Sequence, residues 1–286
     1  MIDLDEFAAE VGAEGPVTIT GLSTRGGAVP GVRVVTAPAG VDWVQADEMI
    51  MCCGAGTPVA DVRNALAEHR QTVALPIGGT VGGALAVGRS DVRRLGLGPV
   101  RDVLLQARYV SARGEVVKAG GPTVKNVSGF DLCRLLVGSF GTLGFMGEVL
   151  LRTRPLPAVS QWFVVDALDP FPVFSSLHRP VSVLWNGRQV WTLLEGHAGD
   201  VDHQARHCGL RAVDGPPPLP TGSRRSLHPA DVVNVAGTFV AEIGVGVVHH
   251  TDPWVGPTLL PRVVELGRAI RHEFDPEGRL NPGIDV

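Results

Sequence analysis

Lysine, tyrosine and cysteine are scarce in this sequence of 286 residues, and these shortages limit what the protein can be. The four cysteines form no C-x-x-C pair, so neither a zinc site nor a disulfide framework is indicated. We expect no bound metal and a reducing, cytoplasmic compartment. Only two lysines accompany 23 arginines, and the net charge is −4 with a pI near 6.1. This balance gives no reason to expect a nucleic acid as a partner.

Long apolar runs are missing as well. No run reaches the roughly eighteen residues that a transmembrane helix needs. The N-terminal residues MIDLDEFAAEVG are acidic and lack the basic and apolar regions of a signal peptide. The sequence therefore predicts no direct insertion into a membrane, and any membrane association would go through a partner.

Glycine and proline, by contrast, are abundant, with 37 and 22 residues. Their uneven distribution along the chain indicates where one domain ends and the next begins. Pro155 and Pro157 mark a change, after which glycine-rich loops thin out and four of the five tryptophans follow. We predict one domain over 1–156, a small α+β domain over 157–255, and a C-terminal helix and tail over 256–286. The predicted fold class is α+β.

Apolar residues at alternate positions predict the strands, and apolar residues at helical spacing predict the helices. Strands are predicted at 17–20, 33–36, 48–54, 103–110, 115–119 and 145–153, and in the second domain near 161–165, 181–185, 188–194 and 237–249. Helices are predicted at 58–69, 131–137 and 261–274, and near 169–177 and 199–208.

The densest glycine loop is Pro76-Ile77-Gly78-Gly79-Thr80-Val81-Gly82-Gly83. Because glycine has no Cβ, several backbone N–H groups of such a loop can converge on one anion. Apolar helix formers follow, so the positive end of a helix would face the same ligand. Three or four hydrogen bonds to a phosphate, each worth about 1.5–3 kcal/mol, would anchor a pyrophosphate. A purely structural glycine turn is the alternative interpretation.

Three further segments are unusual. Gly138-Ser139-Phe140-Gly141-Thr142-Leu143-Gly144 lies between a predicted helix and a strand, the reverse of the order in a Rossmann-type loop. Lys125-Asn126-Val127-Ser128-Gly129-Phe130-Asp131 precedes that helix, and Asp131 suits its N-terminus. The tail FDPEGRLNPG, residues 274–283, is stiffened by proline, so we expect the rest of the chain to hold it. Taken alone, the two loop segments also fit close backbone packing or a capped surface helix.

Together and in this order, the four segments resemble those of flavoproteins with the vanillyl-alcohol-oxidase type of FAD domain, also called the PCMH-type FAD-binding fold. Within that family the resemblance is greatest to the FAD-binding subunit of bacterial glycolate oxidase. It covers roughly residues 15–156 and 262–283, where TVGGALAVGRS, VKNVSGFDLCRLLVGSFGTLG and FDPEGRLNPG carry it as a set. The resemblance implies two α/β subdomains with FAD between them and a small α+β cap domain.

The resemblance also implies which residues hold FAD. The pyrophosphate would contact the loop at 76–84 and an earlier loop at 21–27, while 129–131 and 138–144 would lie near the flavin and adenosine. Because the early loop, GLSTRGG, has no histidine for covalent attachment, we expect non-covalent FAD. The implied FAD contacts are Gly21, Ser23, Thr24, Arg25, Pro76, Gly78, Gly79, Thr80, Val81, Gly82, Gly83, Gly129, Phe130, Asp131, Gly138, Ser139, Gly141, Thr142, Leu143, Gly144 and Asn281.

Oxidation of a 2-hydroxy acid needs a base for the hydroxyl proton and a cation for the carboxylate. In the predicted cap domain, His249 and His250 are candidate bases and Arg188 is a candidate carboxylate ligand. The alternative is that the two histidines end a strand, partly exposed, and that Arg188 is a turn cation. The segment H-x-G-D-G-N-x-H of the larger catalytic relatives is missing here.

We therefore predict an FAD-dependent oxidoreductase subunit that oxidises a 2-hydroxy acid such as glycolate and passes electrons to a partner. Since the sequence has no cysteine array for an iron–sulfur cluster, the expected partners are a catalytic flavoprotein paralogue and an iron–sulfur subunit. Two alternatives stay open. One is a non-catalytic flavin-binding or assembly subunit of a multi-subunit dehydrogenase, and the other is an FAD dehydrogenase acting on another substrate, such as a sugar.

Overall fold

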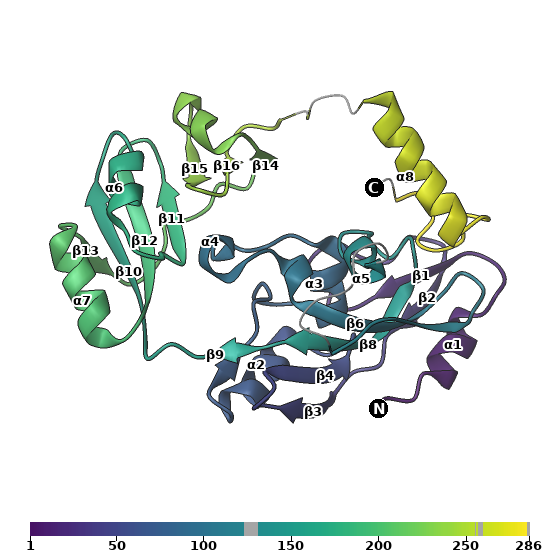
Figure 1. Ribbon diagram of the computed structural model, residues 1–286. Helices are drawn as coiled ribbons and strands as arrows, with labels where there is room; N and C mark the ends of the chain where they lie inside the picture. Colours follow the sequence, from purple (N-terminus) through teal and green to yellow (C-terminus); the bar gives the residue numbers. More distant parts are fainter. Residues whose placement is uncertain (123–130, 255, 257–259, 285–286) are drawn as a thin grey trace. The chain divides into compact units, whose positions relative to one another are not determined.

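The computed structural model describes residues 1–122, 131–254, 256 and 260–284, which fall into two compact units. Unit 1 comprises Met1–Asp91, Pro99–Leu156 and Leu259–Val286, and unit 2 comprises Val92–Gly98 and Pro157–Thr258. Figure 1 labels the helices and strands of both units. Each unit buries its own apolar residues and is described by itself.

Unit 1 is built around a five-stranded antiparallel sheet with the strand order β3-β4-β8-β6-β7. A parallel pair, β1-β2, and a short antiparallel pair, β5-β9, are separate from it. The strands are β1 (Val17–Thr20), β2 (Arg33–Thr36), β3 (Val41–Gln45), β4 (Ile50–Gly54), β5 (Gln71–Thr72), β6 (Leu104–Val110), β7 (Val116–Gly120), β8 (Phe145–Arg152) and β9 (Arg154–Pro155). The helices are α1 (Asp5–Val11), α2 (Val59–Ala67), α3 (Val81–Val87), α5 (Leu132–Leu136), α8 (Pro261–Phe274) and the 3-10 helix η1 (Val100–Asp102).

The core of unit 1 follows from the apolar pattern of its elements. Strand β8 is buried at every position except its last, Arg152, which suits its nearly continuous apolar run. Helix α2 buries Val59, Val62 and Leu66, a spacing that places all three on one helix face. These residues belong to one large buried cluster that also holds α1 and α3 in place.

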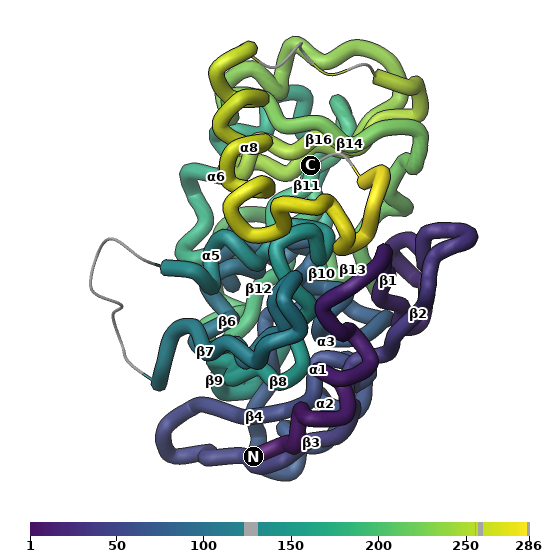
Figure 2. Tube along the Cα trace, turned by 90° about the vertical axis from the view of Figure 1, so that its right-hand side faces the viewer, coloured from purple at the N-terminus to yellow at the C-terminus, as the bar shows by residue number. Residues whose placement is uncertain are grey.

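The C-terminal tail returns to the first strand of unit 1. The amide of Val17 donates to Arg279 O and the amide of Asn281 donates to Val17 O, both at 2.9 Å. Figure 2 shows the yellow tail next to the purple β1. The tail is thereby part of unit 1, although more than 120 residues of sequence separate it from β8 and β9.

Two buried side chains hold this tail, as the sequence led us to expect. The Asp275 carboxylate accepts from Arg279 N at 3.0 Å and from Leu280 N at 2.7 Å, which closes a tight turn. The Arg279 guanidinium is buried and donates to five backbone carbonyls. These are the carbonyls of Val11, Gly12, Glu14, Gly15 and Ala112.

Unit 2 is a seven-stranded antiparallel sheet with the order β13-β10-β12-β11-β15-β16-β14. Trp185 and Phe239 belong to its main buried cluster, against which Leu95 packs, and Gly96 N donates to Val181 O at 3.1 Å. These contacts explain why 92–98 belongs to unit 2. The strands are β10 (Val159–Asp166), β11 (Ser182–Trp185), β12 (Gln189–Gly196), β13 (Arg211–Val213), β14 (Ser223–Ser226), β15 (Phe239–Glu242) and β16 (Val247–His250). The helices are α4 (Arg94–Leu97), α6 (Phe171–Ser176), α7 (Ala198–His207) and the 3-10 helix η2 (Pro229–Asn234).

The mixed sheets and helices confirm the predicted α+β class, and α8 has the predicted bounds. The prediction of a single strand near 237–249 was wrong, because this segment forms a hairpin of β15 and β16. Gly244 and Gly246, with φ of +81° and +80°, turn the chain there in a region of backbone space that favours glycine. The sequence pattern also gave no indication of α1 or β3.

Among the described residues, none of the helices is long and apolar enough to cross a bilayer.

Candidate functional site

A cavity of about 350 Å³ lies in unit 1, within the range of about 300–1,000 Å³ that small-molecule sites occupy. Its walls come from the loop after β1, the loop after β4, helix α3, the segment before and into β8, and the C-terminal tail. The lining is mostly apolar. It consists of Ile19, Thr20, Gly21, Leu22, Ser23, Thr24, Arg25, Gly26, Gly27, Ala37, Ala55, Gly56, Thr80, Gly82, Gly83, Ala86, Val87, Phe140, Gly141, Gly144, Phe145, Met146, Asn281 and Ile284.

The loop before α3 has three consecutive amides without an acceptor. In the described part of the chain, the N–H groups of Gly78, Gly79 and Thr80 donate to no residue. The next two, of Val81 and Gly82, donate at 2.9 and 2.7 Å to carbonyls of the loop after β4, which fixes the loop. Adjacent amides of this kind form an anion-binding group that suits a phosphate. Thr80 itself lines the cavity.

Arg25 connects this loop to the loop after β1. Its Nη1 donates to Gly78 O at 2.8 Å, and its Nη2 donates to Ile77 O at 3.1 Å and to Pro76 O at 3.4 Å. Burial lowers the pKa of Arg25 from its usual value, without making the guanidinium neutral at any ordinary pH. Since the guanidinium is occupied by three carbonyls, it holds the two loops together and turns the carbonyls of 76–78 toward itself.

Asn281 connects the tail to two other walls of the cavity. Its Oδ1 accepts from Thr18 Oγ1 at 2.8 Å and from Ile19 N at 3.1 Å, and its Nδ2 donates to Phe140 O at 2.7 Å. The side chain is buried and its φ is +46°, a conformation that asparagine tolerates better than most residues. All the hydrogen-bonding capacity of Oδ1 is thus used for position, while Nδ2 keeps one hydrogen free of a described partner.

Two cavity glycines have no room for a side chain. A Cβ on Gly21 would lie 2.9 Å from Thr80 Oγ1, the atom that accepts from Gly83 N at the start of α3. A Cβ on Gly141 would lie 2.7 Å from Asn281 Nδ2, and the φ of Gly141 is +73°. The glycines therefore allow the backbone of three segments to approach closely around the cavity.

The structure brings about half of the predicted FAD contacts together, and their role stays a prediction. Those on the cavity wall are Gly21, Ser23, Thr24, Arg25, Thr80, Gly82, Gly83, Gly141, Gly144 and Asn281. Those that lie off the wall are Pro76, Gly78, Gly79, Val81, Asp131, Gly138, Ser139, Thr142 and Leu143. Gly129 and Phe130 lie outside the described residues.

Local bonding explains why several of these residues are off the wall. Ser139 Oγ donates to Leu136 O at 2.9 Å and Thr142 Oγ1 donates to Ser139 O at 2.8 Å, so both hydroxyls serve the turn itself. Asp131 accepts from Arg134 N at 3.3 Å as the N-cap of α5. Conversely, sequence analysis missed Gly56, whose Cβ would lie 2.2 Å from Ala37 O. The G-A-G-T run at 54–57 was the available signal.

In unit 2, the two candidate histidines have different surroundings. His249 Nε2 lies 2.8 Å from Glu242 Oε1, and its Nδ1 has no partner among the described residues. His250 uses both ring nitrogens on the backbone, with Nε2 2.8 Å from Ala236 O and Nδ1 accepting from Asp252 N at 2.9 Å. Arg188 is exposed in the turn between β11 and β12, where its amide donates to Asn186 Oδ1. Glu242 was not among the residues predicted from the sequence.

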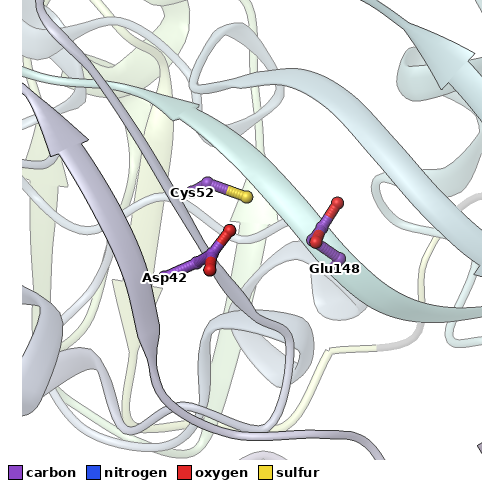
Figure 3. Close-up of side chains that lie close together, drawn as sticks. All are labelled: Asp42, Cys52 and Glu148. Atoms are coloured by element: carbon purple, nitrogen blue, oxygen red, sulfur yellow. The ribbon is translucent and has the colours of Figure 1, made fainter. Parts of the chain in front are cut away.

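A second cluster of polar side chains lies in unit 1, away from the cavity wall. Asp42, Cys52 and Glu148 of β3, β4 and β8 place their potential ligand atoms within 4.8 Å of one another (Figure 3). Both oxygens of Glu148 are engaged, because Ile2 N donates to Oε2 at 2.6 Å and Arg108 Nη1 lies 3.4 Å from Oε1. Burial and the two carboxylates raise the pKa of Cys52 to about 12, so its thiol stays protonated. The amino group of Met1 lies 2.6 Å from Asp42 Oδ2, so the two carboxylates of the cluster hold residues 1–2 against the sheet.

Comparison with known proteins identifies the class of this architecture. Residues 7–120 match the protein-family model of the FAD binding domain. The match confirms the predicted resemblance and FAD as the cofactor. The unpaired amides at 78–80 and the mostly apolar cavity fit such a group, which has a charged pyrophosphate and aromatic rings.

Two curated proteins are similar to this chain in sequence. Glycolate oxidase subunit GlcE of Escherichia coli (strain K12) is 29% identical over 227 residues, covering 74% of this chain and 65% of that protein. D-lactate dehydrogenase of Archaeoglobus fulgidus is 37% identical over 142 residues, covering 48% of this chain and 32% of that protein. The chain therefore spans less than two thirds of the length of either relative.

Among solved structures, an alkyldihydroxyacetonephosphate synthase has a TM-score of 0.66 at 13% sequence identity, covering 98% of this chain and 72% of that chain. At this identity the likeness concerns the fold alone. Together with the family match, it confirms the predicted PCMH-type FAD-binding fold.

Proposed function

We propose that this protein is an FAD-dependent oxidoreductase subunit that oxidises a 2-hydroxy acid such as glycolate. The observation that carries the proposal is the cavity of unit 1, with three adjacent amides beside it that have no acceptor in the described chain. The names of the curated relatives, a glycolate oxidase subunit and a D-lactate dehydrogenase, support the choice of substrate class.

Each unit has a distinct task in this proposal. When bound, FAD supplies the acceptor for a hydride from the α-carbon of the substrate. In unit 1, the amides of Gly78, Gly79 and Thr80 bind its pyrophosphate, while Arg25 and Asn281 keep the surrounding loops in place. These bonds are contacts within the chain, and loops fixed in this way lose less conformational freedom when a ligand binds.

The base for the substrate hydroxyl is His249. His250 is the weaker candidate, because its two ring nitrogens are bonded to backbone groups and proton uptake would break the bond from Asp252 N. Nδ1 of His249, by contrast, is not engaged by any described residue. Arg188 remains the proposed ligand of the substrate carboxylate, since its guanidinium can form two parallel bonds to such a group.

We propose that electrons from the reduced cofactor leave through another protein. The sequence has only four cysteines and no array of the kind that holds an iron–sulfur cluster. We therefore propose a complex with a catalytic flavoprotein paralogue and an iron–sulfur subunit. The description of GlcE as a subunit of glycolate oxidase supports such an assembly.

Anaerobic reduction of the bound flavin tests the function directly. The FAD-loaded protein is mixed with glycolate, D-lactate or another 2-hydroxy acid, alone and with its partner subunits, while the absorbance of oxidised flavin is followed. Bleaching by a 2-hydroxy acid is the expected result. A protein that holds FAD but stays oxidised under every condition would instead be a non-catalytic flavin-binding or assembly subunit. Bleaching by a sugar alone would change the substrate class.

A further inference from the structure

We propose that Glu242 is a positioning residue that holds the ring of His249 in the form that accepts a proton, an inference that rests on the function proposed above. His249 Nε2 lies 2.8 Å from Glu242 Oε1, and the two side chains are 12% and 2% exposed. An ionised carboxylate can only accept hydrogen bonds, so Nε2 carries the hydrogen and donates it. Nδ1 is then left with its lone pair.

The register of the β15–β16 hairpin places Glu242 beside His249. Val240 is opposite His249 and Glu242 is opposite Val247, so Glu242 and His249 are diagonal neighbours on one face of the sheet. Arg224 of β14 is the cross-strand partner of His249. Because paired strands carry all three residues, the arrangement exists before any substrate binds.

The second oxygen of Glu242 indicates more than a packing role. Oε2 is buried and has no hydrogen-bond partner among the described residues. A buried carboxylate oxygen without a donor is unfavourable, and a carboxylate that only stabilised the fold would be expected to have both oxygens satisfied. A carboxylate hydrogen-bonded to the ring can stabilise the positive charge that the ring gains on accepting the substrate proton.

The chemical step balances with these groups. Bound FAD would supply the two-electron acceptor for the hydride that leaves when the Cα–H bond of the 2-hydroxy acid breaks. The O–H bond breaks as well, its electron pair forms the C=O bond of the 2-oxo acid, and its proton goes to His249 Nδ1. Glu242 takes up no proton and acts only through the Nε2–H bond.

The variant Glu242→Gln tests the inference in the full FAD-loaded chain. Glutamine has nearly the same volume and can still accept the Nε2–H bond, but it has no charge. We expect the limiting rate of flavin reduction by the better of glycolate and D-lactate to fall about 100-fold. The substrate concentration that gives half the limiting rate, the FAD content and the melting temperature should stay as in the wild type.

The matched control is Glu195→Gln, which removes an exposed carboxylate of β12 whose Oε1 accepts from Ser160 Oγ at 2.9 Å. This control should react at the wild-type rate. A Glu242→Gln protein as fast as the wild type would overturn the inference and leave the proposed function intact. A wild type that no 2-hydroxy acid reduces would overturn both.

A second measurement does not depend on the variant folding. In the ¹⁵N-labelled wild type, the ring nitrogens of His249 should report a hydrogen on Nε2 and none on Nδ1 when the ring is neutral. The opposite tautomer would contradict a donor bond from Nε2 to Glu242, and with it the positioning role.

Discussion

Asn281 and Phe140 are joined by a 2.7 Å hydrogen bond from Nδ2 to the backbone carbonyl, across 141 residues of sequence. The Oδ1 atom of the same side chain accepts from Thr18 Oγ1 and Ile19 N, the two middle residues of β1. One buried amide therefore connects three segments of the cavity wall. We therefore expect the C-terminal tail to be needed for cofactor binding.

Replacement of Asn281 by alanine should therefore weaken both the fold and FAD binding. The change removes three hydrogen bonds of about 1 kcal/mol each and leaves buried backbone groups unpaired, so we expect a loss of about 3 kcal/mol in the free energy of unfolding. Urea titration and FAD titration would measure the two effects. Asn234→Ala, at an exposed position of η2, is the control and should change neither. Unaltered FAD affinity in Asn281→Ala would contradict the role given to the tail.

Replacement of Arg25 by lysine should lower FAD affinity although the charge is kept. A single ammonium group cannot reproduce the spread of bonds from two nitrogens to Gly78, Ile77 and Pro76. We expect the dissociation constant of FAD to rise about tenfold, as measured by flavin fluorescence, corresponding to about 1.4 kcal/mol. Arg113→Lys, at an exposed turn position, should have no effect. If Arg25→Lys binds FAD as tightly as the wild type, the guanidinium does not set the loop geometry.

The substitutions Gly141→Ala and Gly267→Ala should have opposite effects on thermal stability. In Gly141→Ala the new methyl group would lie 2.7 Å from Asn281 Nδ2 at a φ of +73°, so stability and FAD content should both fall. In Gly267→Ala nothing lies within 4 Å of the new atom, and the residue is inside α8. Because alanine favours a helix over glycine by up to about 1 kcal/mol, this variant should melt at a higher temperature. Equal melting temperatures for the two variants would refute the packing described around Gly141.

The thiols should differ sharply in reactivity. Burial raises the pKa of Cys52 and Cys53 to about 12 and that of Cys133 to about 11, whereas Cys208 is partly exposed. At pH 8, iodoacetamide should therefore modify Cys208 and spare the other three until the protein is denatured, which peptide mapping by mass spectrometry would show. Cys208→Ser should leave the native protein unlabelled. Fast labelling of Cys52 in the native protein would contradict its burial.

The same thiols give a pH dependence of stability. Their pKa is about 9.0 in the unfolded chain and higher in the folded chain, so the folded state favours the protonated form. Their contribution to stability is complete below pH 9 and is lost as the pH rises toward 12. Urea unfolding at a series of alkaline pH values should show this decline. Cys52→Ser should reduce its steepness.

Most of the local structure could be predicted from the sequence because the signal lies within each segment. Helix α8 has an amphipathic pattern after a proline, and its bounds matched. The hairpin at 239–250 was not predicted because Val245, between its two glycines, and Val247 and Val248 after them continue the strand pattern through the turn. The site was harder, because its positioning residues act across the sequence. Arg279 donates to carbonyls that any residue could supply, and the partnership of Glu242 with His249 appears only once the hairpin register is known.

The most direct test of the central claim is the visible spectrum of the purified protein, recorded before heat denaturation and again on the filtrate afterwards. We predict the absorption bands of oxidised flavin in the native protein and their passage into the filtrate, because the loop at 21–27 has no histidine to bind the cofactor covalently. A colourless protein that also fails to take up added FAD would contradict the account. In that case the cavity of unit 1 would not be a flavin site.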